Sequence, residues 1–168
     1  MKYKEEISFY EKQKMPLLFL IPIGILLLFV VFSFISKNKI NENVWPFVTV
    51  IIGCTSVAVL FYMMSLETII NETGVYIKMF PIQWKYKVYS WDSISEAYVR
   101  KYNPIMEYGG WGYRFGMNLV TNRKISVAYS LSGNMGLQLI LTTGRRVLIA
   151  THKPEEITEI LKELGKTD

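Results

Sequence analysis

The chain has 168 residues, 51% of them apolar, and a formal net charge of +5. This length suits one small domain beside a short additional element, and the apolar share is more typical of a membrane protein than of a soluble domain. With one Cys and one His, the chain can form neither an intramolecular disulfide nor a metal site built from several Cys or His side chains.

Two uncharged apolar runs occupy the first third of the chain. They cover residues 15–35 and 44–66, and neither contains Asp, Glu, Lys, Arg or His. A run of about 18 or more such residues is long enough to cross a bilayer as a helix. We therefore expect residues 1–66 to form an N-terminal flank and a two-helix transmembrane hairpin. A cleaved signal peptide fits poorly, because the first run is too long and no small-residue cleavage site follows it.

Basic residues on the two sides of the first run predict the orientation of the hairpin. Four lysines precede the first run and two follow it: Lys2, Lys4, Lys12 and Lys14, then Lys37 and Lys39. Flanking Lys and Arg tend to stay cytoplasmic, so we expect both termini and the following domain on the cytoplasmic side of the inner membrane. Because neither run holds an ionisable group, an ion pathway formed by this chain alone is disfavoured.

The second run has a side of small residues on which another helix could approach closely. These residues are Thr49, Gly53, Ser56 and Ala58. Packing against the first run is one interpretation, and pairing with a second copy of this chain is the other. The expected partners of this region are thus the lipid bilayer and, through the second run, the chain itself.

Residues 67–168 alternate short apolar segments with turn residues, which predicts a mainly-β domain. Strands are expected at 67–70, 75–80, 84–90, 96–102, 113–120, 124–129, 136–142 and 146–150. One helix is expected to begin at Pro154 and to end at Gly165. Its apolar stripe is Ile157, Ile160, Leu161 and Leu164. That stripe needs a surface to cover, which a bent antiparallel sheet would supply.

Several motifs resemble those of membrane-anchored bacterial proteins that carry a pleckstrin-homology-like (PH-like) domain after two membrane helices. The motifs are Trp91-Asp92-Ser93-Ile94, Gly110-Trp111-Gly112-Tyr113-Arg114, Gly136-Leu137-Gln138-Leu139, and the segments 144–149 and 151–156. The resemblance implies a PH-like barrel of about seven antiparallel strands, closed by one C-terminal helix. The first hairpin loop, residues 71–74, lacks the several Lys and Arg with which phosphoinositide-binding PH domains hold polyphosphate head groups. That binding function is therefore disfavoured.

The glycine-rich segment around Trp111 is the sharpest candidate site. Glycines on both sides of Trp111 free the backbone and leave the indole room to project. Glu107 and Arg114 could pair across this segment. We interpret Glu107, Trp111, Tyr113 and Arg114 as a ligand-binding or partner-binding site, with Trp111 as the apolar anchor and Arg114 as the donor. The alternative is a tight turn with Trp111 packed inward.

Arg145 and Arg146, with Arg123 and Lys124, lie in or beside predicted turns. They are candidates for contact with anionic lipid head groups, and solvated turn charges are the alternative. Residues 67–168 carry 13 Lys and Arg against 10 Asp and Glu, a net charge of +3. This charge is too small to predict nucleic-acid binding, which requires a dense basic stripe.

The sequence contains no Gly-rich phosphate loop, nucleophile elbow or metal-binding motif, so we expect neither an enzyme nor a cofactor or metal. The expected function is a non-enzymatic adaptor at the cytoplasmic face of the membrane that binds another protein or a peptide. Two alternatives stay open: a domain that senses anionic lipid, and an accessory subunit of a larger membrane complex.

Overall fold

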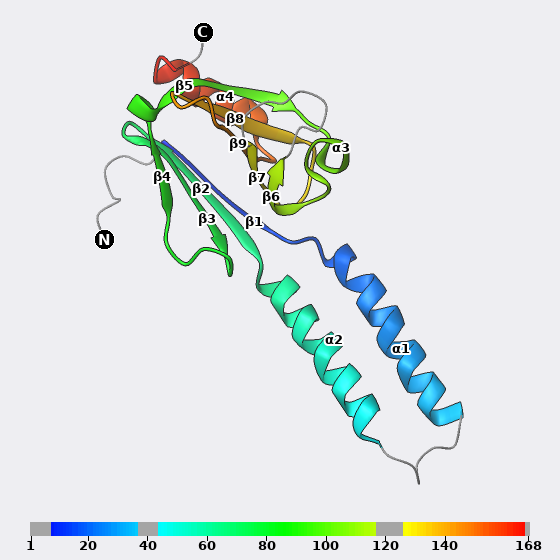
Figure 1. Ribbon diagram of the computed structural model, residues 1–168. Coiled ribbons are helices and arrows are strands. Elements are labelled where there is room, and N and C mark those ends of the chain that lie inside the picture. The colour runs from blue at the N-terminus through cyan, green and yellow to red at the C-terminus, as the bar shows by residue number, and fades with distance from the viewer. Residues whose placement is uncertain (1–7, 37–43, 117–125, 167–168) are drawn as a thin grey trace. The chain divides into compact units, whose positions relative to one another are not determined.

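A computed structural model describes residues 8–36, 44–116 and 126–166. The chain divides into two compact units. One unit is the helical hairpin, residues 15–64. The other, called the β domain below, joins the residues before Met15 to those after Met64. Figure 1 shows the elements of both units in chain order.

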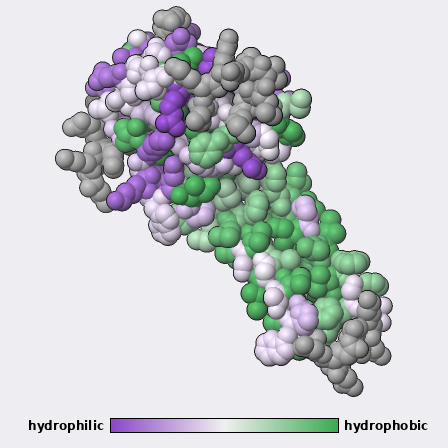
Figure 2. Space-filling view, in the orientation of Figure 1, coloured by the Kyte–Doolittle hydropathy of each residue, from purple (hydrophilic) through white to green (hydrophobic). Residues whose placement is uncertain are grey.

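The hairpin consists of two helices that are long and apolar enough to cross a membrane. They are α1 (Ile21–Ser36), which continues a 3-10 turn (Leu17–Leu20), and α2 (Trp45–Met63). The two helices contact each other, with the rings of Phe34 and Phe47 4.6 Å apart. None of the residues of α1 and α2 is buried, and Figure 2 shows hydrophobic residues over the surface of the helices. The two predicted helices are therefore confirmed, although the second ends before residue 66.

The N-terminal flank differs from the expectation, because it is a strand of the β domain. Strand β1 (Phe9–Lys14) pairs antiparallel with β2 (Ser65–Asn71), although the whole hairpin lies between them in sequence. Figure 1 shows β1 in blue alongside β2. Phe9, Glu11 and Gln13 alternate with exposed residues and are buried on one face of the strand. Two of these three core positions are polar, which hides the strand pattern in the sequence.

The first sheet of the β domain, sheet A, has the strand order β1-β2-β3-β4. Its third and fourth strands are β3 (Gly74–Phe80) and β4 (Lys87–Ser90). The register places Phe9, Ile70, Val75 and Tyr89 in one row across the four strands, and all four are buried. β4 is shorter than the predicted strand 84–90, because residues 81–86 form the β3–β4 loop.

The second sheet, sheet B, has the strand order β5-β8-β9-β7-β6. Its strands are β5 (Ile94–Lys101), β6 (Gly112–Gly116), β7 (Ser126–Ser130), β8 (Met135–Leu141) and β9 (Arg146–Ala150). β7 and β9 are parallel, whereas the other pairs of this sheet are antiparallel. Residues 117–125, which include parts of the predicted strands 113–120 and 124–129, lie outside the described residues.

The expected barrel of about seven antiparallel strands is corrected in two respects. The described residues form nine strands in two separate sheets and do not close into a barrel, and one strand pair is parallel. Hairpin patterns in a sequence predict only pairings between neighbouring strands. The pairing of β7 with β9 joins strands that are separated by β8, so it is decided by packing between distant segments.

The core lies between the two sheets and beneath the C-terminal helix α4 (Pro154–Glu163). Hydrogen bonds join the sheets: Gln13 donates to the carbonyl of Ala150 over 2.8 Å, and Gln83 donates to the hydroxyl of Tyr129 over 3.4 Å. In α4, the apolar residues Ile157, Ile160 and Leu161 are buried. The predicted helix and the side that it buries are thus confirmed.

A buried carboxylate ties the N-terminal strand to the C-terminal part of the domain. Glu11 accepts hydrogen bonds from the Thr151 hydroxyl at 2.6 Å, from the His152 backbone N–H at 2.8 Å and from the Gln13 amide at 2.9 Å. A buried charge is tolerated where such donors replace its lost water. The segment that precedes the hairpin therefore completes the fold of the domain that follows it.

Candidate functional site

The candidate site is built on a short excursion between β5 and β6. Helix α3 (Pro104–Tyr108) begins where the Asn103 side chain accepts hydrogen bonds from the N–H groups of Ile105 and Met106, both at 3.1 Å. It ends at Gly109, whose φ of 70° is in the left-handed region that favours glycine. From the sequence, a strand was predicted to end at residue 102, directly before Asn103-Pro104, and no helix was predicted after it. An N-cap Asn followed by Pro at the first helical position is also a helix-start signal.

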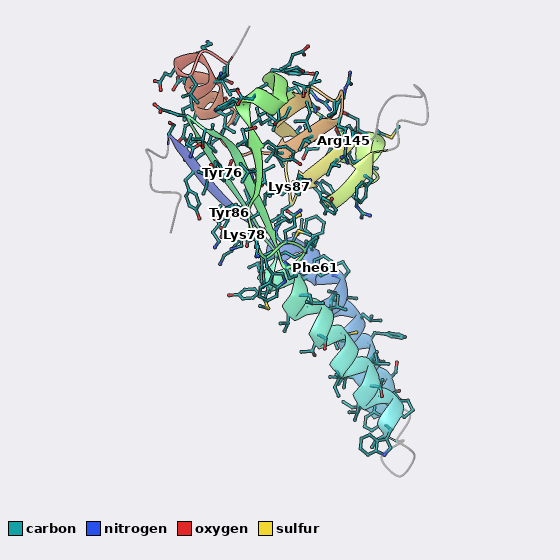
Figure 3. The ribbon with its side chains drawn as sticks, turned by 60° about the vertical axis from the view of Figure 1, so that its left-hand side comes forward. Phe61, Tyr76, Lys78, Tyr86, Lys87 and Arg145 are labelled. Atoms are coloured by element: carbon teal, nitrogen blue, oxygen red, sulfur yellow. The ribbon has the colours of Figure 1, made fainter. Side chains whose placement is uncertain are left out.

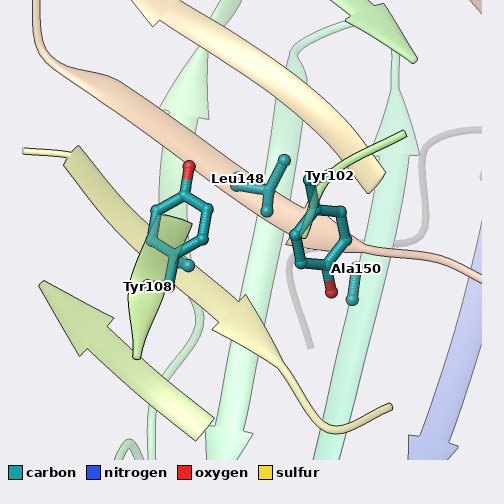
Figure 4. Close-up of a cluster of buried hydrophobic side chains, with 5 residues drawn as sticks. Tyr102, Tyr108, Leu148 and Ala150 are labelled. Carbon is teal, nitrogen blue, oxygen red and sulfur yellow. The ribbon is translucent and has the colours of Figure 1, made fainter. Parts of the chain in front are cut away.

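A small cluster of buried side chains lies with α3 against sheet B. Its members are Tyr102, Tyr108, Ala128, Leu148 and Ala150, of which four are labelled in Figure 4. The rings of Tyr102 and Tyr108 meet edge-on, with centroids 6.2 Å apart. A Cβ added at Gly116 would lie 3.0 Å from the Tyr108 ring. Glycine at this position of β6 therefore permits the close approach of α3.

Glu107 pairs with Arg100 of β5 and not with Arg114. A nitrogen of the Arg100 guanidinium lies 2.7 Å from the Glu107 carboxylate, and Arg100 also donates to Gln138 of β8. Burial raises the pKa of Glu107, but hydrogen bonds and the charge of Arg100 outweigh burial, so the pKa lies below its usual value. Glu107 also accepts from the Asn103 backbone N–H at 2.8 Å. This predicted site residue therefore holds α3 against β5.

Trp111 and Arg114 lie together, as the sequence analysis expected of the site. The Arg114 side chain donates to the carbonyl of Trp111 over 3.1 Å and passes beside Gly110. Arg114 is exposed, whereas Trp111 is half-buried and its indole N–H donates to the carbonyl of Gly133 over 3.3 Å. Trp111 is thus hydrogen-bonded to the β7–β8 connection and is still partly accessible to solvent.

Tyr113 lies on the other face of β6 from Arg114, since neighbouring strand residues point to opposite faces. Its ring packs at 5.1 Å from the ring of Tyr129 and at 5.1 Å from that of Phe115. Of the four predicted site residues, the structure therefore brings Trp111 and Arg114 together, while Glu107 and Tyr113 serve packing and positioning around them.

Two exposed apolar residues of α3 were missed from the sequence. Ile105 is 61% exposed and Met106 is 83% exposed. The backbone N–H groups of Gly109 and Gly110 donate to the carbonyls of α3, so the glycine loop that leads to Arg114 of β6 is folded back against the helix. We call Ile105, Met106, Trp111 and Arg114 the α3–β6 surface. It combines exposed apolar side chains with an exposed guanidinium that can hold a carboxylate in a bidentate manner.

The two turn arginines, Arg145 and Arg146, differ in exposure. Arg145 is exposed in the β8–β9 turn, and Arg146 is half-buried at the start of β9. Burial raises the pKa of Tyr108, and Arg146 is among the cations that oppose this rise. Burial also raises the pKa of Tyr89, and the charge of Arg145 opposes that rise. Arg123 and Lys124 lie outside the described residues.

One Ser–His contact lies near the buried carboxylate. The Ser132 hydroxyl is 2.8 Å from the ring nitrogen Nε2 of His152. Glu11 contacts the backbone N–H of His152, so its carboxylate does not orient the imidazole as the acid of a catalytic triad does. Within the part of the chain that the structure describes, no group of three or more His, Cys, Asp and Glu side chains could hold a metal ion.

No protein-family model matches this chain, and no curated protein matches its sequence. The function must therefore be argued from the hairpin, the β domain and the α3–β6 surface.

Proposed function

We propose that this chain is a non-enzymatic adaptor, anchored in the inner membrane by its hairpin, whose β domain binds a protein or peptide at the cytoplasmic face. We further propose that the β domain is PH-like. Two sheets followed by one C-terminal amphipathic helix, together with the motif resemblance, support this assignment.

The anchoring part of the proposal is supported by the exposure of the helices. Both are long and apolar, and neither buries a residue within the protein. A core helix of a soluble protein would instead bury one side. The cytoplasmic orientation is supported by lysines near the hairpin: the register places Lys12 and Lys78 on either side of Glu67, next to the strand ends that join the helices. Basic residues near membrane spans favour the cytoplasmic side.

The binding part of the proposal is carried by one observation: Ile105 and Met106 are exposed on a helix that is held rigidly. The Arg100–Glu107 ion pair and the Tyr102–Tyr108 packing fix α3 on sheet B. Exposed apolar side chains on a fixed scaffold lose little entropy when a partner covers them. With Arg114 exposed on β6, which follows α3 in the chain, the fitting partner is a peptide segment that carries both an acidic and an apolar side chain.

A photo-crosslinking amino acid at Met106, introduced into the full-length protein in intact cells, tests the proposal. We expect a discrete crosslinked partner that disappears when Arg114→Ala or Trp111→Ala is added. Crosslinking from Glu72, an exposed residue of the β2–β3 turn, is the matched control. Equal crosslinking from both positions, unchanged by Arg114→Ala, would remove the α3–β6 surface as the binding site.

Anchoring has a separate test. Membranes that contain the full-length chain are washed with alkaline carbonate, which releases peripheral proteins. We expect the chain to stay in the pellet, since two apolar helices hold it in the bilayer. Its release into the supernatant would overturn the anchoring part of the proposal.

A further inference from the structure

We infer that the β3–β4 loop, residues 81–86, is a second membrane contact of this protein, in which Trp84 and Ile82 enter the head-group region of the bilayer that holds the hairpin. This inference rests on the anchoring part of the proposed function. It adds a lipid-binding site on the β domain itself, distant in sequence from both helices.

Chain connectivity places this loop at the membrane end of sheet A. Lys14 ends β1 and is followed directly by Met15 of the hairpin, and Ser65 begins β2 directly after Met64. The register aligns Lys14 with Ser65 and Ser65 with Phe80, the last residue of β3. With no linker on either strand, the end of the sheet from which the β3–β4 loop emerges is the end that meets the spans.

The apolar side chains of the β3–β4 loop lie close to Phe80, which ends β3. The backbone N–H of Gln83 donates to the carbonyl of Met79 over 2.7 Å, which turns the loop back on β3. The Trp84 ring meets the Phe80 ring edge-on, with centroids 5.1 Å apart, and neighbouring strands are about 4.8 Å apart. Trp84 therefore lies at the end of sheet A where Ser65 follows directly on the hairpin. The head-group layer begins where the apolar spans end, and indole side chains favour that layer.

Exposure separates the loop residues into an outer and an inner set. Trp84 is 75% exposed and Ile82 is 49% exposed, whereas Gln83 between them reaches inward to the hydroxyl of Tyr129. An indole left in water by the fold is costly, but Trp is the residue that favours the bilayer–water interface. The fold thus holds two apolar side chains of one loop outward, as expected of a surface that another phase covers.

The charges around the loop fit a lipid head-group layer better than a protein core. Lys85 and Lys87 are exposed beside Trp84, and Lys78 lies 5.4 Å from the centre of the Tyr86 ring. Figure 3 labels Lys78, Tyr86 and Lys87 on the strands and loop of sheet A. Apolar side chains flanked by lysines are the composition of segments that lie in the interface of an anionic membrane.

Site-directed spin labelling of the full-length protein tests the inference. Cys54, the one native cysteine, is replaced by Ser, and a nitroxide is attached after Trp84→Cys, with Ile82→Cys as a second probe. Glu72→Cys is the matched control, because its turn lies at the opposite end of sheet A. The proteins are reconstituted into phosphatidylethanolamine and phosphatidylglycerol vesicles. The ratio of oxygen accessibility to nickel-chelate accessibility then reports depth in the bilayer.

We expect this ratio to be several-fold higher at positions 84 and 82 than at position 72, and unchanged when the lipid-to-protein ratio is raised. Equal, water-like ratios at all three positions in vesicles that resist carbonate extraction would overturn the inference and leave the anchoring intact. Protection at 84 that fades on lipid dilution would also overturn it, because the loop would then be covered by a second copy of the chain. Release by carbonate would instead show that the anchoring itself has failed.

Discussion

The hairpin and the β domain place the same apolar residue types in opposite surroundings. Leu28 of α1 is 72% exposed, whereas Leu148 of β9 is fully buried. The β domain collects its large side chains between two sheets, as water requires. The hairpin leaves them on its exterior, which is the arrangement of helices whose side chains meet lipid and whose backbone groups are paired internally. Under the proposed anchoring the two units are stabilised by different solvents, and a given substitution should have different consequences in each.

The largest expected contrast comes from one substitution made in both units. Leu148→Ala truncates a fully buried side chain of the cluster that packs with Tyr102 and Tyr108. It should lower the free energy of unfolding of the β domain by about 2–5 kcal/mol. Leu28→Ala should change the same free energy of unfolding by less than about 0.5 kcal/mol. Urea unfolding of the full-length protein in mild detergent, followed by near-ultraviolet circular dichroism, measures both. Similar losses for the two variants would contradict the assignment of different solvents.

A second contrast concerns the N-terminal strand, which precedes the hairpin but belongs to the β domain. Glu11→Gln replaces the carboxylate with a neutral amide, so the hydrogen bonds from Thr151 and His152 lose their charge assistance and one of these two donors faces an NH₂ group. We expect the free energy of unfolding of the β domain to fall by about 1–3 kcal/mol and the amide hydrogens of β1 to exchange faster. Glu96→Gln, at an exposed position of β5, is the control. Equal stability of the Glu11 and Glu96 variants would show that the buried carboxylate contributes nothing to the stability of the domain.

The smallest effect is a pH dependence at Glu67, beside the strand end that joins α2. Burial raises the pKa of Glu67, but hydrogen bonds from Lys12 and Tyr86 outweigh burial, so the pKa lies below its ordinary value of 4.5. A lowered pKa means that the stabilisation is present above the ordinary value and is lost as the pH falls through the lower, folded-state value. Because the Lys12 side chain is 44% exposed in its ion pair with Glu67, we expect the ionised carboxylate to add about 0.5–1 kcal/mol to the free energy of unfolding.

Comparison of the wild type with Glu67→Gln isolates that contribution. The wild type should be the more stable of the two near neutral pH, and the difference should shrink in acid as Glu67 becomes protonated. Denaturant midpoints measured for both proteins across this range provide the test. A difference that stays constant with pH would mean that packing, and not the carboxylate charge, distinguishes the two side chains.

Most elements of the fold follow from local patterns. The two helices, α4 and strand β9 lie where apolar run length, an apolar stripe and strand-forming residues predict them. β1 was missed because Glu11 and Gln13 occupy core positions, which a hydrophobic pattern cannot reveal. Among the candidate site residues, Trp111 and Arg114 lie together, but the exposed face of α3 was missed because no helix was predicted at residues 104–108.

The sequence alone determined that this chain has two membrane-length helices and a mainly-β remainder, because run length and alternation are local properties of the chain. Only the tertiary structure decided that residues before the hairpin complete the domain after it, and that Glu107 meets Arg100. It also decided that Trp84 emerges at the end of sheet A from which the chain enters the helices. These pairings are set by strand register and by buried hydrogen bonds between distant segments, and no local pattern encodes them.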